Sequence, residues 1–165
     1  MSRLFYRGPS LDALHEQYAK RGRIDENAPI TASHAIRIDA PLARVWAQLS
    51  NPAGWERLDP DIHDVRLAGA VAADVSFTWK NGSARIRSRF AVVDEGRELT
   101  WTGVSFGARV VHRHLLEPAP PGTRLICEES MAGPLVTLFF SSAKLDAALE
   151  KWLTAIKAGS ERSTS

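Results

Sequence analysis

The sequence has little cysteine, a nearly balanced charge and no long apolar run. Each of these features excludes a class of protein. Its single cysteine, Cys127, cannot form an internal disulfide. The 21 Lys and Arg against 19 Asp and Glu give a net charge of +2, far from the strong field of a typical nucleic-acid binder. The longest apolar run near a helix signal, LVTLFF at 135–140, is much shorter than the roughly 18 to 20 residues that span a bilayer. We therefore expect neither nucleic acid nor a membrane span.

Several functional motifs are also missing. The N-terminal stretch MSRLFYRGPS has no apolar core of the kind that signal peptides carry, so we expect a soluble protein in a reducing cytoplasm. There is no glycine-rich phosphate loop, no nucleophile elbow and no Cys-x-x-Cys pair. What is present is a chain of 165 residues with 44% hydrophobic content, which is enough for one globular domain with a buried core.

The chain divides into three parts by pattern. Residues 1–30 are expected to be an N-terminal extension with one short helix, N-capped by Ser10 and ended by Gly22. Residues 31–159 are expected to form the domain, and residues 160–165 a disordered tail. Because the extension helix carries an apolar stripe, it should dock on its own domain or on a partner.

The domain begins with a strand and short helices. Period-two alternation from Ser33 to Ala40 predicts a strand, and Pro41 then opens a helix over 41–51. The proline- and glycine-broken segment 51–62 has room for one or two further helical turns. Turn signals such as Asn81-Gly82 then separate a series of strands in an antiparallel meander. These strands are predicted at 62–68, 73–79, 83–94, 97–103, 108–117 and 123–132.

The C-terminal region returns to helical spacing. An apolar stripe at steps of four and three predicts one helix from Pro134 to Lys157, which would be about 35 Å long and could lie across a whole sheet. The stripe consists of Leu138, Ser142, Leu145, Leu149, Trp152 and Ile156. The fold class predicted from this order is α+β, with a curved antiparallel sheet of about seven strands around a long C-terminal helix.

The last predicted hairpin, VVHRHLLEPAPPGTRLICEES at 110–130, places two histidines and a carboxylate among aliphatic residues. A four-residue loop over 119–122 pairs His112 with Glu129 on one face of the hairpin. Directly opposed Cβ atoms lie roughly 4.5 to 5.5 Å apart, so this imidazole and carboxylate can form a hydrogen bond. His114 pairs with Cys127 on the same face, which we expect to line a cavity.

The opposite face of this hairpin carries Arg113, Arg124 and Glu128, which we expect in water. Three interpretations of the His112–Glu129 pair remain open. It is a structural polar pair, an anchor for a ligand, or an acid/base pair in which His112 carries the proton and Glu129 orients it.

A metal is a further alternative, since His-x-His near a Glu and a Cys has donor atoms suited to zinc. Three side chains from two strands would have to converge for such a site. We therefore predict no metal and no cofactor.

Alternation extends the predicted cavity wall to neighbouring strands and to the C-terminal helix. The predicted ligand-binding residues are Trp79, Ser88, Phe90, Trp101, His112, His114, Glu129, Leu145, Leu149 and Trp152. The catalytic candidates, if the protein is an enzyme, are His112 and Glu129.

Several stretches resemble the SRPBCC, or START-like, superfamily and, within it, the polyketide cyclase/dehydrase-like group of small bacterial proteins. They are IRIDAPLARVWAQLSNPAGW at 36–55, ELTWTG at 98–103 and VHRHLLEPAPPGTRLICEESMAG at 111–133. The resemblance covers about residues 33–158, and Met131 stands where the family usually has an aromatic residue. It implies the helix-grip fold, in which the sheet grips the long helix around an apolar cavity.

Three functions follow from these features. The first is binding of a small, mainly hydrophobic molecule, lipid-like or polyketide-like, between the sheet and the C-terminal helix. The second, implied by the resemblance, is a polyketide cyclase/dehydratase that uses the His/Glu pair for acid/base catalysis. The third is an interaction module without a ligand, whose N-terminal helix docks on a partner or on a second copy in a homodimer.

Overall fold

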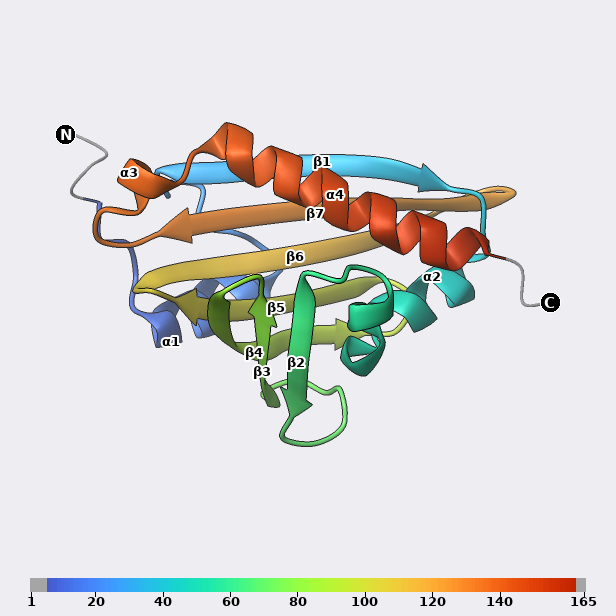
Figure 1. The fold of residues 1–165 in the computed structure, drawn as a ribbon, viewed down its shortest axis with the longest axis horizontal. Helices are drawn as coiled ribbons and strands as arrows, with labels where there is room; N and C mark the ends of the chain where they lie inside the picture. Colours follow the sequence, from blue (N-terminus) through green and yellow to red (C-terminus); the bar gives the residue numbers. More distant parts are fainter. Residues whose placement is uncertain (1–5, 163–165) are drawn as a thin grey trace.

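The computed structural model describes residues 6–162. They form one curved antiparallel sheet with a long C-terminal helix lying across it (Figure 1). The strand order is β1-β7-β6-β5-β4-β3-β2, so the meander closes by placing the first strand beside the last. The strands are β1 (Ile30–Ile38), β2 (Ile62–Leu67), β3 (Ser76–Asn81), β4 (Ala84–Asp94), β5 (Glu98–Ser105), β6 (Ala108–Ala119) and β7 (Gly122–Ala132). The predicted fold class is confirmed.

Two short helices follow β1, as the sequence predicts. In α2 (Leu42–Leu49), Val45 and Leu49 are buried because they recur at helical spacing on the face toward the sheet. The second is a 3-10 helix, η4 (Pro52–Arg57), and it buries Trp55. The Trp55 indole nitrogen donates to the Leu49 carbonyl at 3.1 Å, which fixes this loop against the end of α2.

The C-terminal helix differs from its prediction. It is broken into α3 (Val136–Phe139) and α4 (Ser142–Glu161), because Ser141 is extended and its hydroxyl accepts a hydrogen bond from the Lys144 amide as an N-cap. Leu138 and Ser142 are therefore exposed, although the predicted stripe includes them. The helix also extends through residues 160 and 161, which were expected in a disordered tail. Ser160 is fully buried, and residues 163–165 lie outside the described part of the chain.

The N-terminal extension docks on the face of the sheet opposite α4. Its helix forms as predicted, in three contiguous segments: α1 (Leu11–Ala13), the π-helical η2 (Leu14–Tyr18) and the 3-10 η3 (Ala19–Arg21). Ser10 caps its start, and Gly22 ends it with a positive φ of 66°. Leu14 and Ala19 pack against Ala91 and Val111, whose side chains point to the outer face of the sheet. Residues 1–5 of the predicted extension lie outside the described residues.

Polar contacts also hold this extension in place. His15 is buried and its two ring nitrogens lie 2.9 Å from the Thr102 hydroxyl and 2.9 Å from the Asp74 carboxylate. Beneath the end of the extension, Arg113 forms ion pairs at 3.0 Å with Glu98 and at 3.0 Å with Glu128. The expectation that Arg113 lies in water is therefore wrong, since its side chain is 16% exposed.

The face toward α4 is filled largely by aromatic rings. Trp55 lies at their centre, with its ring centroid 5.4 Å from Trp101 and 5.4 Å from Trp152. Phe77 and Phe90 stack at 4.4 Å further along the sheet. Aromatic pairs at such separations stabilise a core beyond their buried area. No helix within residues 6–162 is both long enough and apolar enough to cross a membrane.

Candidate functional site

A cavity of about 950 Å³ lies between the sheet and α4 and reaches the surface at one end. Its wall is mostly apolar, and its lining includes Trp55, Ile62, Trp79, Ile86, Trp101, Val110, His112, Glu129, Met131, Leu145, Leu149 and Trp152. The volume is near the top of the range of roughly 300 to 1,000 Å³ that ligand pockets span.

The surface end of the cavity is bordered by α3 and by the turn between β5 and β6. Phe106 in that turn is 87% exposed, and Leu135 and Phe139 are 54% and 76% exposed, although all three line the cavity. Gly133 brings the two segments together, because a side chain there would meet the Gly107 carbonyl oxygen at 2.6 Å. These apolar side chains form part of the rim of the cavity.

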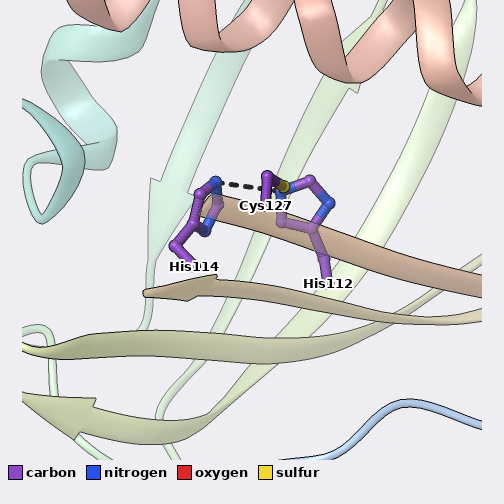
Figure 2. A group of neighbouring side chains, drawn as sticks. All are labelled: His112, His114 and Cys127. Carbon is purple, nitrogen blue, oxygen red and sulfur yellow. Dashed lines mark hydrogen bonds between the residues drawn. The ribbon is translucent and has the colours of Figure 1, made fainter. Parts of the chain in front are cut away.

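A buried polar cluster is set into the cavity wall (Figure 2). The predicted register is confirmed, since His112 pairs with Glu129 and His114 with Cys127 across β6 and β7. The loop has two residues, Pro120 and Pro121, where four were predicted, because Ala119 and Gly122 also pair. The observed two-residue loop and the predicted four-residue loop give the same register.

His112 has both ring nitrogens engaged within this cluster. Its Nδ1 bonds the Glu129 carboxylate at Oε2. Its Nε2 lies 3.1 Å from His114 Nε2 and 3.3 Å from Cys127 Sγ. The Trp101 indole stacks on its ring at 4.5 Å with an interplanar angle of 15°.

The hydrogen bonds assign the protons. The Trp152 indole N–H donates to His114 Nε2 at 2.9 Å, so that nitrogen is an acceptor. Any hydrogen bond between the two Nε2 atoms then has His112 as its donor. Since His112 also donates from Nδ1 to Glu129, it is an imidazolium, which the stacked Trp101 ring stabilises further.

The pKa values agree with this arrangement. Burial by itself lowers the pKa of His112, but the adjacent Cys127 sulfur and Glu129 carboxylate outweigh burial and raise this pKa to about 10. Burial is the largest cause that raises the pKa of the Cys127 thiol, although the neighbouring His112 opposes it.

His114 is the neutral member of the cluster. Burial, followed by the neighbouring His112 charge, lowers the pKa of His114 well below its ordinary value. Its Nδ1 is buried and has no hydrogen-bond partner within residues 6–162. The Leu99 backbone is near enough to favour the charged form slightly, but it does not reach hydrogen-bonding geometry.

The geometry changes which atom of the pair can meet a ligand. Both nitrogens of His112 are used, whereas Glu129 lines the cavity and its hydrogen bond within residues 6–162 is made through Oε2. Oε1 therefore remains as an acceptor for an O–H or N–H group in the cavity. The sequence points to His112 and Glu129 together as the candidate anchor.

The predicted ligand-binding residues fall into two groups. Those that line the cavity are Trp79, Trp101, His112, Glu129, Leu145, Leu149 and Trp152. The others are Ser88, Phe90 and His114. The Ser88 hydroxyl accepts from the Trp79 indole at 3.1 Å, Phe90 is fully buried in the core, and His114 lies in the wall behind His112.

Some lining residues were missed. Val110 and Met131 share faces with His112 and Glu129, so alternation could have identified them. Val136 and Phe140 belong to the apolar run that we had assigned to a continuous helix. The reason for expecting no metal also needs correction, because the two histidines and Cys127 do converge, with donor atoms within 4.8 Å of one another.

A family model described as "Polyketide cyclase / dehydrase and lipid transport" matches residues 29–161. No curated protein matches the chain. Among solved structures, the hypothetical protein jhp0584 from Helicobacter pylori aligns over 98% of this chain and 99% of its own, with 14% identity and a TM-score of 0.74. Protein MLL2253 from Mesorhizobium loti aligns over 82% and 99%, with 16% identity and a TM-score of 0.66.

A third similar structure is DynU16, a protein in the dynemicin biosynthetic locus. It aligns over 78% of this chain and 46% of its own, with 14% identity and a TM-score of 0.63. At such low identity, these structural matches establish the shared fold.

Proposed function

This chain belongs to the polyketide cyclase/dehydrase and lipid transport family, and we propose that it binds one small, mainly hydrophobic molecule between the sheet and α4. The observation that carries the proposal is the cavity of about 950 Å³, whose largely apolar wall contains the buried ion pair His112–Glu129. Pockets of this kind gain affinity from apolar contact and orientation from a few polar groups.

The polar group offered to the ligand is Glu129 Oε1. An ionised carboxylate only accepts hydrogen bonds, so the matching ligand carries an O–H or N–H donor on an otherwise apolar body. A hydroxylated lipid-like or polyketide-like molecule has this chemistry. A bond to a buried charged acceptor is worth about 1.5 to 3 kcal/mol, which corresponds to about 10- to 100-fold in affinity.

The test uses the neutral fluorescent dye N-phenyl-1-naphthylamine, which is apolar and carries one N–H. Ala147 and Ala148 are neighbours on α4 and both are exposed, but only Ala148 lines the cavity. We expect Ala148→Trp to weaken dye binding by about tenfold or more by filling the cavity, and Ala147→Trp to bind like the wild type. Equal binding by the wild type and both variants would show that the dye does not occupy this cavity.

The role of Glu129 can be tested without a mutation. The N-methyl derivative of the dye has nearly the same apolar body but no N–H donor. We expect it to bind about 10- to 100-fold more weakly than the parent dye. Equal affinities for the two dyes would contradict the assignment of Oε1 as the anchoring acceptor.

One observation favours a second candidate function, that of a polyketide cyclase/dehydratase. A carboxylate held by a buried imidazolium faces the cavity, which is an arrangement suited to removing a proton from a polyketone. Glu129 would then be the catalytic residue and His112 a positioning residue, the reverse of the roles expected from the sequence. In that case Glu129→Gln should lower the turnover of a polyketone by about 100-fold or more, while dye binding persists in the folded variant.

A further inference from the structure

We propose that His112, His114 and Cys127 form a zinc-binding site in the wall of the sheet. Their donor atoms, the two Nε2 atoms and Sγ, all lie within 4.8 Å of one another and come from the adjacent strands β6 and β7 (Figure 2). Two imidazoles and one thiolate are the ligand types that zinc prefers in proteins. This inference does not depend on the proposed ligand-binding function.

The measured separations suit tetrahedral coordination. Bonds of about 2.0 to 2.1 Å to nitrogen and 2.3 Å to sulfur place the ligand atoms of a tetrahedral ion roughly 3.3 to 3.6 Å apart. His112 Nε2 lies 3.1 Å from His114 Nε2 and 3.3 Å from Cys127 Sγ. These two pairs of donor atoms therefore need to move apart by only a few tenths of an ångström, and the donor atoms of His114 and Cys127 lie within 4.8 Å of each other.

A carboxylate already orients one of these ligands. His112 bonds Glu129 through Nδ1, which leaves Nε2 to point at the other two donors. Metal-binding histidines almost always donate their second ring N–H to such a partner, which fixes the ring and makes the ligating nitrogen more basic. The buried Nδ1 of His114 has no hydrogen-bond partner in the described part of the chain, and its Nε2 lies beside His112 Nε2.

Binding of the ion releases protons from the cluster and leaves its net charge unchanged. Zn²⁺ replaces one proton on His112 Nε2 and one on the Cys127 sulfur, and both protons leave to solvent. Two positive charges enter and two leave, so the buried cluster keeps the same net charge. No charge is added to the interior of the protein, which is the usual obstacle to a buried ion.

Metal binding requires one existing hydrogen bond of the cluster to break. The Trp152 indole N–H occupies the lone pair of His114 Nε2 that the metal needs. Trp152 also lines the cavity, so rotation of this ring would open the fourth coordination position on the cavity side. Removing the indole N–H should therefore strengthen metal binding, which distinguishes a metal site from a purely structural hydrogen-bond cluster.

A second group of donors, His15, Glu16 and Asp74, is less suitable. The Lys20 ammonium lies 3.0 Å from Glu16 and 3.0 Å from Asp74, so a cation already occupies this place. Both nitrogens of His15 are also engaged by protein groups.

The experiment is a titration of the full-length, chelator-treated protein with Co²⁺, followed by displacement with Zn²⁺. Cys127 is the chain's single cysteine, so a sulfur-to-cobalt charge-transfer band can come from no other residue. We expect this band, with the visible absorption of tetrahedral cobalt, to saturate at one ion per chain and to disappear on addition of Zn²⁺. Absence of the sulfur-to-cobalt band in the folded wild type would overturn the proposal.

Three variants sharpen the result. Cys127→Ser should abolish the charge-transfer band, and Trp152→Phe should retain it and bind Co²⁺ more tightly. Glu129→Gln should weaken binding by about 10- to 100-fold, because it removes the carboxylate that orients His112. His63→Ala removes a histidine on β2, away from the cluster, and should leave the titration unchanged. Unchanged Co²⁺ affinity in both Trp152→Phe and Glu129→Gln would contradict the roles given to the indole N–H and to the orienting carboxylate.

Discussion

Replacing Glu129 by glutamine should destabilise the protein by about 3 to 5 kcal/mol, because it removes one partner of a buried ion pair. The side chains of His112 and Glu129 are each 11% exposed, so water cannot replace the lost charge. Cys127, the other group near His112, is a thiol because burial raises its pKa. The amide oxygen of glutamine can still accept the bond from Nδ1, so the loss comes mainly from an uncompensated imidazolium.

The assay is thermal unfolding of chelator-treated protein, compared with Glu128→Gln. For a domain of this size, each kcal/mol shifts the Tm by about 2 to 4 °C, so Glu129→Gln should lower it by about 6 to 20 °C. Glu128 is the adjacent residue on the opposite face, its side chain is 31% exposed, and its partner Arg113 keeps a second ion pair with Glu98. Its replacement should cost less than about 1 kcal/mol.

A double variant separates charge from packing. Replacing both His112 and Glu129 by leucine removes the charges together and should recover much of the stability lost by Glu129→Gln, since apolar pairs often replace buried ion pairs without loss. If Glu129→Gln and Glu128→Gln lower the Tm equally, the pair is not the buried, charge-coupled unit described above.

Two further predictions concern the N-terminal extension. His15→Ala leaves the buried Thr102 hydroxyl without its partner, so it should cost about 1 to 3 kcal/mol and speed amide exchange in residues 11–21; unchanged exchange there would contradict the docking role of His15. Burial, together with the hydrogen bond to Asp25, raises the pKa of Tyr6 to about 12. Because the raised pKa means that the folded state holds this proton more tightly, stability should fall as pH rises from about 10 through about 12. An absorbance titration should show one late tyrosine that is lost in Tyr6→Phe, and an unchanged titration in that variant would refute the assignment.

The antiparallel meander from β2 to β7 and the β6–β7 register were predictable because side-chain alternation and turn residues act locally. His112, Glu129 and Cys127 each face the interior, as a period of two requires. The predicted loop length was wrong, but the predicted register was correct. Two- and four-residue loops centred on the same bond align the same pairs of residues. Alternation fixes the side of the sheet on which a residue lies, and this part of the prediction is secure.

Alternation does not predict how deeply a residue is buried on its side of the sheet. His114 points inward like His112, but Trp152 covers it and it does not line the cavity. Ser88 likewise points inward and is covered by the Trp79 indole. Such coverage depends on large side chains from distant elements, and no local pattern encodes it.

The break before α4 was missed for a related reason. Apolar residues continue at helical spacing from Leu138 into α4, so this spacing alone does not reveal the break. The N-cap signal of Ser141 was present in the sequence, and it should have outweighed the period. The break separates α3 from α4 and so leaves Phe139 at the rim of the cavity.

The most direct test of the central claim is mass spectrometry of organic extracts from freshly purified wild type, Ala148→Trp and Ala147→Trp. The account predicts that the wild type and Ala147→Trp release the same small apolar molecule with a hydroxyl or N–H group, near one per chain, and that Ala148→Trp releases far less. The same content in all three proteins, including none, would contradict the claim that this cavity holds a ligand.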